Sequence, residues 1–145
     1  MKVIVQRCDK AKVSVENQVV GSITKGLMLL VGFTKDDNST NIDYLIDKII
    51  NLRIFDDENG IMNKSLIDIN GSILSISQFT LYADTSKGRR PSYINALKGS
   101  LATKLYDEFN QKLKKLGIHT ETGIFGAEMK VDFINDGPIT IILEK

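Results

Sequence analysis

The sequence is poor in the residues that most catalytic and metal sites use. Its 145 residues include one cysteine, Cys8, one histidine, His119, and no tryptophan. An intrachain disulfide is therefore excluded, and a lone thiol is typical of a reducing compartment. A zinc site of the Cys/His type needs three or four such ligands. Neither GxxxxGK[ST] nor GxGxxG occurs, which leaves a nucleotide cofactor without support, so we expect no metal and no cofactor.

An excess of charge and a long apolar run are also lacking. The 19 basic and 18 acidic residues give a formal net charge of +1, which excludes a polycation that binds nucleic acid by bulk charge. No apolar run reaches membrane-spanning length, and the N-terminus turns polar too early for a signal peptide. We expect one soluble domain over residues 1–145, in the cytoplasm, with no membrane partner.

Several segments have the patterns of β-strands. Residues 26–32 form an unbroken apolar run between glycines, which is typical of a central strand buried on both faces. Apolar and polar residues alternate over 13–23, which suggests a hairpin, and again over 127–133. Residues 72–79 are rich in isoleucine and leucine and predict a further strand, and residues 139–143 predict the last one.

Two stretches carry the period of an amphipathic helix. Residues 42–50 place apolar side chains on one stripe, with Ser39 or Thr40 as the expected N-cap. Residues 101–116 repeat the pattern, with Ser100 as the expected N-cap. The order of elements predicts an α/β fold, in which the two helices pack on a mixed sheet.

A polar cluster ends the predicted strand at 72–79. Continued alternation would place Gln78 and Thr80 on one face and Ser77 and Phe79 on the other. The end of a strand is where α/β folds bind ligands. The ordinary alternative is a strand that leaves the core and turns its polar side chains to solvent.

A basic loop follows at residues 84–92. The loop contains three basic residues, Lys87, Arg89 and Arg90, and one acidic residue, and Tyr93 follows it directly. Cations spaced along a flexible loop can follow a phosphate backbone, and neighbouring aromatic rings can stack on bases. A solvated basic loop without a partner is the alternative.

Residues 135–140 contain an unusual Gly137-Pro138 pair. An X-Pro bond can be cis, and a Gly-Pro turn exposes carbonyl groups that no side chain covers. The alternative is an ordinary turn between two strands.

Two other features indicate structure rather than chemistry. The acidic run at 56–60 ends in Asn-Gly and is a turn by composition. His119 lies between a predicted helix end and a strand, a context more typical of a surface histidine than of a general base.

Taken together, the segments 77–80, 87–92 and 135–140 closely resemble the D-aminoacyl-tRNA deacylase family. The resemblance runs from Val5-Gln6-Arg7 to Thr122-Gly123-Ile124-Phe125-Gly126-Ala127. It implies hydrolysis of the ester between a D-amino acid, and also glycine, and the 3′-terminal adenosine of tRNA, with rejection of L-aminoacyl-tRNA. It also implies a homodimer, a sheet curled toward a barrel, and no DNA partner.

The resemblance further implies roles for individual residues. Ser77, Gln78, Phe79 and Thr80 would form the catalytic wall, where the backbone N–H of Phe79 or a neighbour polarises the ester carbonyl. A cis Gly137-Pro138 turn from the other subunit would hold the α-ammonium group and exclude L side chains, braced by Arg7. Five further residues would contact the adenosine and the rest of the tRNA: Phe125, Met129, Lys87, Arg89 and Arg90.

Three alternatives stay open. Thr80 could be a covalent nucleophile instead of a residue that positions water, although no base is visible to activate it. The chain could be an RNA-binding module without catalysis, or a small-molecule esterase that works through Ser77 and His119.

Overall fold

The computed structural model describes all 145 residues, and one long strand organises the fold. β1 (Lys2–Val15) pairs antiparallel with β3 (Gly26–Gly32) through its first half and with β2 (Gln18–Ile23) through its second half. β8 (Lys130–Glu144) pairs antiparallel with β1 along nearly its whole length. The hairpin expected over 13–23 is therefore confirmed.

The rest of the sheet is parallel and curls back on itself. β6 (Ser72–Ser77) pairs parallel with β3, and β7 (Thr120–Thr122) pairs parallel with β6, which gives the order β2-β1-β3-β6-β7. The curl brings β2 close to β7. The approach is tight at Gly21, where an added Cβ would lie 2.8 Å from the carbonyl oxygen of Thr122. The sheet is thus mixed and nearly closed into a barrel, as expected.

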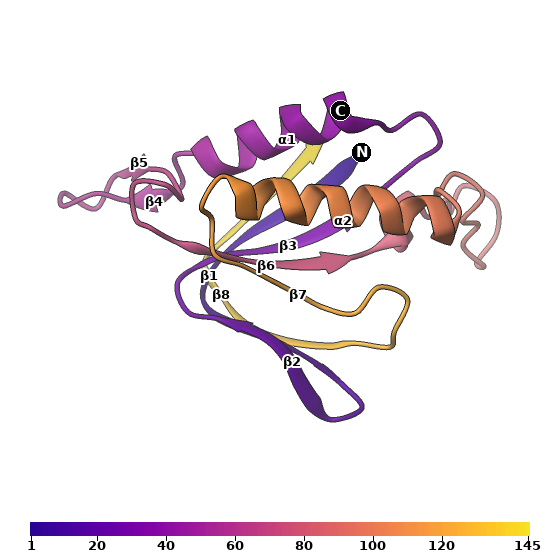
Figure 1. Cartoon of the computed structure of the whole chain (residues 1–145), viewed down its shortest axis with the longest axis horizontal. Helices are drawn as coiled ribbons and strands as arrows, with labels where there is room; N and C mark the ends of the chain where they lie inside the picture. The colour runs from indigo at the N-terminus through magenta and orange to yellow at the C-terminus, as the bar shows by residue number, and fades with distance from the viewer.

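Two helices cover one face of this sheet (Figure 1). α1 (Ser39–Asn51) and α2 (Gly99–Lys115) are joined by Lys112, whose Nζ lies 2.5 Å from Asp43 Oδ1. The predicted caps are wrong: Asn38 caps α1 by accepting a hydrogen bond from the Thr40 amide, whereas Lys98 precedes α2 without a side-chain cap. Neither helix is long and apolar enough to span a membrane.

The core has two parts because β3 is buried on both faces. Leu27 and Leu29 belong to a cluster of 20 buried residues between the sheet and the helices. Met28 lies on the opposite face, in a cluster of seven that the curl of the sheet encloses together with Leu74 and Ile76. The unbroken apolar run of this strand is therefore explained by packing on two sides.

The remaining elements are short. β4 (Phe55–Asp56) and β5 (Met62–Lys64) form a separate hairpin, and the predicted turn between them is confirmed. Asp57 stabilises that turn, since its Oδ1 accepts hydrogen bonds from two backbone amides at 2.9 and 3.1 Å. A 3₁₀ helix, η1 (Phe79–Tyr82), follows β6.

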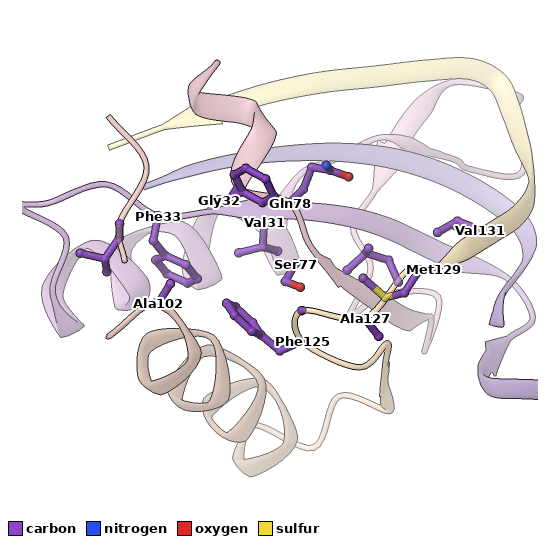
Figure 2. Close-up of a pocket in the computed structure, with 14 residues that line it drawn as sticks. Val31, Gly32, Phe33, Ser77, Gln78, Ala102, Phe125, Ala127, Met129 and Val131 are labelled. Carbon is purple, nitrogen blue, oxygen red and sulfur yellow. The ribbon is translucent and has the colours of Figure 1, made fainter. Parts of the chain in front are cut away.

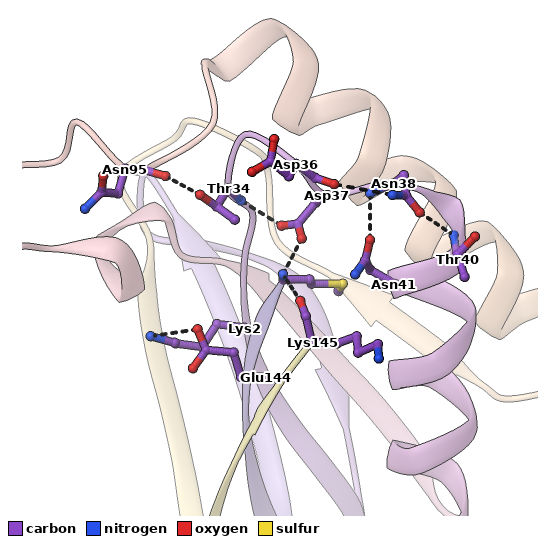
Figure 3. Close-up of polar contacts among 11 residues, drawn as sticks. Lys2, Thr34, Asp36, Asp37, Asn38, Thr40, Asn41, Asn95, Glu144 and Lys145 are labelled. Carbon is purple, nitrogen blue, oxygen red and sulfur yellow. Dashed lines mark hydrogen bonds and ion pairs between the residues drawn. The ribbon is translucent and has the colours of Figure 1, made fainter.

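A buried polar cluster joins the first residue, the last residue and the start of α1 (Figure 3). The amino group of Met1 contacts the Asp37 carboxylate and donates a hydrogen bond to the carbonyl oxygen of Lys145 at 2.6 Å. The other carboxylate oxygen of Asp37 accepts from the Thr34 amide at 2.7 Å. Met1 and the Asp37 side chain are almost fully buried, and the Asp37 carboxylate compensates the charge of the ammonium group.

Candidate active site

A cavity of about 270 Å³ lies where β3 and β6 end. Because the two strands are parallel neighbours, their carboxyl ends meet at one edge of the sheet. The first turn of α2, through Ala102, and the segment over 125–131 complete the wall (Figure 2). Of the residues singled out from sequence, the cavity brings together these: Ser77, Gln78, Phe79, Phe125 and Met129.

The strand that supplies the polar wall is shorter than predicted. The amide of Gln78 donates the last bond of the ladder, to the carbonyl oxygen of Val31 at 2.7 Å. The chain then turns into η1, so the expected alternation over 77–80 is wrong: Ser77, Gln78 and Phe79 all line the cavity. Gly32 permits this close approach, since a Cβ there would lie 2.8 Å from the Gln78 carbonyl oxygen.

Thr80 is not among the residues that line the cavity. Its hydroxyl oxygen accepts a hydrogen bond from the side-chain amide of Gln78. The carboxamide NH₂ group is only a donor and cannot take up a proton. The pair therefore orients Gln78 and supplies no base to the threonine.

The apolar wall is held by a residue that the sequence did not single out. Tyr106 of α2 is buried, and its hydroxyl donates to the carbonyl oxygen of Ser75 at 2.7 Å. The amide of Gly123 donates to the same oxygen at 3.2 Å. The rings of Tyr106 and Phe125 pack with their centroids 5.8 Å apart, so Tyr106 joins α2, β6 and the Phe125 segment.

No residue that lines the cavity carries an acid, an amine, an imidazole, a phenol or a thiol. His119 lies outside it, with its side chain 64% exposed and its Nε2 3.6 Å from Glu121, which confirms a surface histidine. What the cavity offers chemically is backbone amide and carbonyl groups, the Ser77 hydroxyl and the Gln78 carboxamide.

The Gly137-Pro138 bond is cis and lies in a bulge of β8. The register of β8 runs from Asn135 opposite Cys8 to Thr140 opposite Gln6, so residues 136–139 stand opposite Arg7 alone. Gly137 has φ +115°, a backbone conformation that residues other than glycine rarely adopt. The expected turn between two strands is therefore a bulge within one strand.

Arg7 braces this bulge from inside the protein. Its side chain is 8% exposed, and Nε lies 2.8 Å from Asp136 Oδ2. Nη1 donates to the carbonyl oxygen of Ile54 at 2.8 Å and lies 3.4 Å from Asp56 Oδ1. Arg7 thus links Asp136, the residue before Gly137, to Ile54 and to Asp56 of the β4–β5 hairpin.

Gly137 and Pro138 do not line the cavity of their own chain. Both are exposed, and the fourteen lining residues include neither of them. The structure of one chain therefore contains the polar wall and the bulge as two separate surfaces.

The predicted basic loop is exposed and its ends are paired. Asp84 and Ser92 exchange two backbone hydrogen bonds, at 2.8 and 2.9 Å. Lys87, Arg89 and Arg90 lie between them and form no ion pair within the chain. These three cations do not line the cavity.

Sequence reasoning missed part of the wall. Phe33, Leu97 and Ala102 line the cavity but resemble ordinary core residues in the sequence. Gly32 could have been found, because a glycine that closes a buried strand often marks a close approach of backbone.

Comparison with known proteins gives a consistent result. The sequence model of the family described as D-Tyr-tRNA(Tyr) deacylase matches residues 4–144. The chain is 56% identical over 145 residues to a D-aminoacyl-tRNA deacylase of Limosilactobacillus reuteri, with both chains covered completely. It is 54% identical over 144 residues to a protein of the same name from Bacillus cytotoxicus, with 99% of each chain covered.

Two solved structures are similar to this one. A structure described as a c-Myc DNA unwinding element binding protein is 37% identical, with a TM-score of 0.94 and coverage of 100% of this chain and 99% of the other. A structure described as a probable eukaryotic D-amino acid tRNA deacylase is 19% identical, with a TM-score of 0.84 over 98% of this chain and 97% of the other, which shows a shared fold.

Proposed function

Because this chain belongs to the D-Tyr-tRNA(Tyr) deacylase family, we propose that it hydrolyses the ester bond between a D-amino acid and the 3′-terminal adenosine of tRNA. The observation that carries the proposal is the cavity in which Ser77, Gln78 and Phe79 face Phe125 and Met129. The polar wall would receive the ester, and the apolar wall would receive the adenosine.

The chemistry that this cavity supports is attack by water on a polarised carbonyl. An aminoacyl ester is already activated, and one well-placed oxyanion donor contributes about 10²–10³ in rate. η1 has no side-chain cap, and the first N–H groups of a helix have no partner within it. The Phe79 N–H, or a neighbour, would therefore donate to the developing oxyanion, while the vicinal ribose hydroxyl assists in place of a side-chain base.

Water attack is favoured over a Thr80 nucleophile for a structural reason. The Thr80 hydroxyl accepts from the Gln78 amide and lies outside the cavity lining, so nothing removes its proton. Thr80→Ala should retain most single-turnover activity, measured with enzyme in excess over D-Tyr-tRNA. A loss of more than about a hundredfold, with an acyl-enzyme trapped in wild type, would instead identify a covalent intermediate.

Handedness is a harder demand than hydrolysis, since enantiomers are equally hydrophobic and an apolar pocket discriminates among side chains only weakly. Gly137 and Pro138 are exposed in the bulge, so their main-chain carbonyls would be available as acceptors, and Arg7 links the bulge to Ile54 and Asp56. Such rigid acceptors would hold the α-ammonium group and leave no room for an L side chain. A glycyl ester has no side chain to exclude, so it would also be cleaved.

The bulge reaches a cavity only if two chains cooperate, because it does not line its own. We therefore include a homodimer in the proposal, with the bulge of one chain entering the cavity of the other. β8 presents exposed Ile134 and Ile142, which a second chain would cover. Analytical ultracentrifugation tests this part, and a monomer with full D-selective activity would refute it.

The basic loop is proposed to contact the tRNA phosphates in the cytoplasm. Replacing Arg89 and Arg90 by alanine together should raise KM for tRNA and flatten its salt dependence, because each phosphate contact releases counterions. An unchanged slope would remove this loop from the contact surface.

The decisive experiment is deacylation of D-Tyr-tRNA and L-Tyr-tRNA side by side. We expect rapid release of D-tyrosine and no release of L-tyrosine above the spontaneous rate. Equal rates for the two would refute chiral selection, and release of neither would refute the deacylase.

The same assay separates the competing functions. A non-enzymatic RNA-binding module, or a DNA-binding protein as the 37% identical structure is described, would leave D-Tyr-tRNA esterified at enzyme excess. An esterase that uses Ser77 and His119 would lose activity in His119→Ala, but His119 lies outside the cavity lining. We expect turnover, and full activity in that variant.

A further inference from the structure

Two aromatic side chains lie exposed at the rim of the cavity. The rings of Phe79 and Tyr93 meet edge to face, with centroids 5.0 Å apart and planes inclined by 70°. Phe79 is 55% and Tyr93 40% exposed. Because Phe79 also lines the cavity, the pair extends the wall of the cavity outward to solvent.

The backbone fixes the position of Tyr93. The bonds between Asp84 and Ser92 close the basic loop immediately before it. Shortly after it, the amide of Leu97 donates to the carbonyl oxygen of Phe33 at 2.9 Å, and both of these residues line the cavity. Tyr93 therefore stands on a short anchored segment between the basic loop and the cavity wall.

The charge beside the aromatic pair is suited to one kind of partner. Lys87, Arg89 and Arg90 precede Tyr93 and form no ion pair within the chain. Proteins that bind single-stranded nucleic acid combine cations that follow the phosphates with aromatic faces on which bases stack. An apolar partner protein would have no use for unpaired cations in the loop that leads to Tyr93.

We propose that Phe79 and Tyr93 form a stacking site for the base of the nucleotide that precedes the terminal adenosine in the single-stranded 3′ end of tRNA. The inference rests on the proposed function, since the adenosine must occupy the cavity for the preceding nucleotide to reach the rim. The cations of the loop then neutralise the phosphates on either side of the stacked base.

The test compares two substrates that differ only in the nucleotides before the adenosine. Tyr93→Ala should lower kcat/KM for D-Tyr-tRNA about tenfold through KM, which is about 1.4 kcal/mol and within the range of base–aromatic stacking. It should change hydrolysis of D-tyrosyl-adenosine less than twofold. Tyr93→Phe keeps the ring and should restore the wild-type KM.

A matched control is Tyr44→Ala. Tyr44 is 43% exposed on α1 and contacts the ammonium groups of Lys48 and Lys145, so its loss should leave both substrates unaffected. An equal effect of Tyr93→Ala on both substrates, or no effect on either, would overturn the stacking site.

A direct binding measurement distinguishes this failure from failure of the deacylase. Wild type should bind a short RNA with the tRNA 3′ sequence more tightly than Tyr93→Ala does, in a fluorescence titration that needs no hydrolysis. If wild type hydrolyses neither ester, the deacylase fails whatever the titration shows. If Tyr93→Ala changes the oligomeric state instead of RNA affinity, a second copy of the chain covers the pair and the inference is wrong.

Discussion

Two buried tyrosine hydroxyls should respond in opposite ways to replacement by phenylalanine. The Tyr106 hydroxyl donates to the Ser75 carbonyl oxygen at 2.7 Å, whereas the buried Tyr82 hydroxyl has no partner in the chain. Burial raises the pKa of both phenols, so both stay protonated near neutral pH. Phenylalanine fills nearly the same volume, which leaves the hydroxyl group as the only difference.

The expected magnitudes follow from the partners. In Tyr106→Phe the Ser75 carbonyl keeps its bond from the Gly123 amide at 3.2 Å, so no acceptor is orphaned. The loss is then that of one net hydrogen bond, about 1 kcal/mol, or about 3 °C in Tm for a chain of this size. Tyr82→Phe removes a buried hydroxyl that has no hydrogen-bond partner in the chain, and it should be neutral or stabilising by up to about 1 kcal/mol.

Urea unfolding followed by circular dichroism measures both changes in one series. Because the two variants make the same chemical change, any general effect of removing a phenol oxygen cancels between them. A larger loss of unfolding free energy in Tyr82→Phe than in Tyr106→Phe would refute the reasoning.

Three further predictions concern charge and burial. Asp37→Asn leaves the buried Met1 ammonium without a counter-charge and should lower the free energy of unfolding by about 3 kcal/mol. Glu144→Gln removes a more exposed ion pair with Lys2 and should lower it by less than about 1 kcal/mol. Backbone and hydroxyl donors lower the pKa of Asp68 below its ordinary 3.8, so its contribution is present above that pH and is lost below it; Asp68→Asn should flatten the acid limb of a stability profile. Burial raises the pKa of Cys8 from 9.0 to about 11, so its contribution is complete below pH 9 and is lost as pH rises through 11. Iodoacetamide at pH 8 should therefore label Cys8 only in urea.

The fold was largely predictable because its main elements bury regular faces. The apolar run at 26–32 and the helical stripe at 42–50 carry their own periodicity, and both elements appear as expected. The helix caps were not predictable, since several polar residues precede each helix and tertiary contacts choose among them. Asn38 caps α1 while Ser39 bonds Glu108 of α2 instead.

The candidate site was predictable only where the signal is local. The segments 77–80 and 135–140 stand out because their polar residues and glycine interrupt regular strands. Tyr106 carries no such signal, because an aromatic residue on the apolar face of a helix has the pattern of any core residue. Its role depends on Ser75, which is 31 residues away in the sequence. The predicted alternation over 77–80 was also wrong because of a contact distant in sequence. β6 loses its partner where β3 ends, and the chain turns into η1 directly after Gln78.

The contacts of Arg7 bear on how the proposed site, whose cavity has no ionisable groups, would distinguish the two hands of its substrate. Burying an arginine is costly unless its donors are all paired. Arg7 is nevertheless buried opposite four residues that the sheet does not pair in register, and its Nε has an ion-pair contact with Asp136 but no hydrogen bond. Its contacts with Ile54, Asp56 and Asp136 link the bulge to the segment at the start of the β4–β5 hairpin. The proposed filter of backbone carbonyls would depend on a fixed geometry, because small displacements of a positioning group have large effects on a reaction. In the proposed function, the buried charge of Arg7 would support the geometry of Gly137 and Pro138, since a buried ion pair is weak evidence for stability.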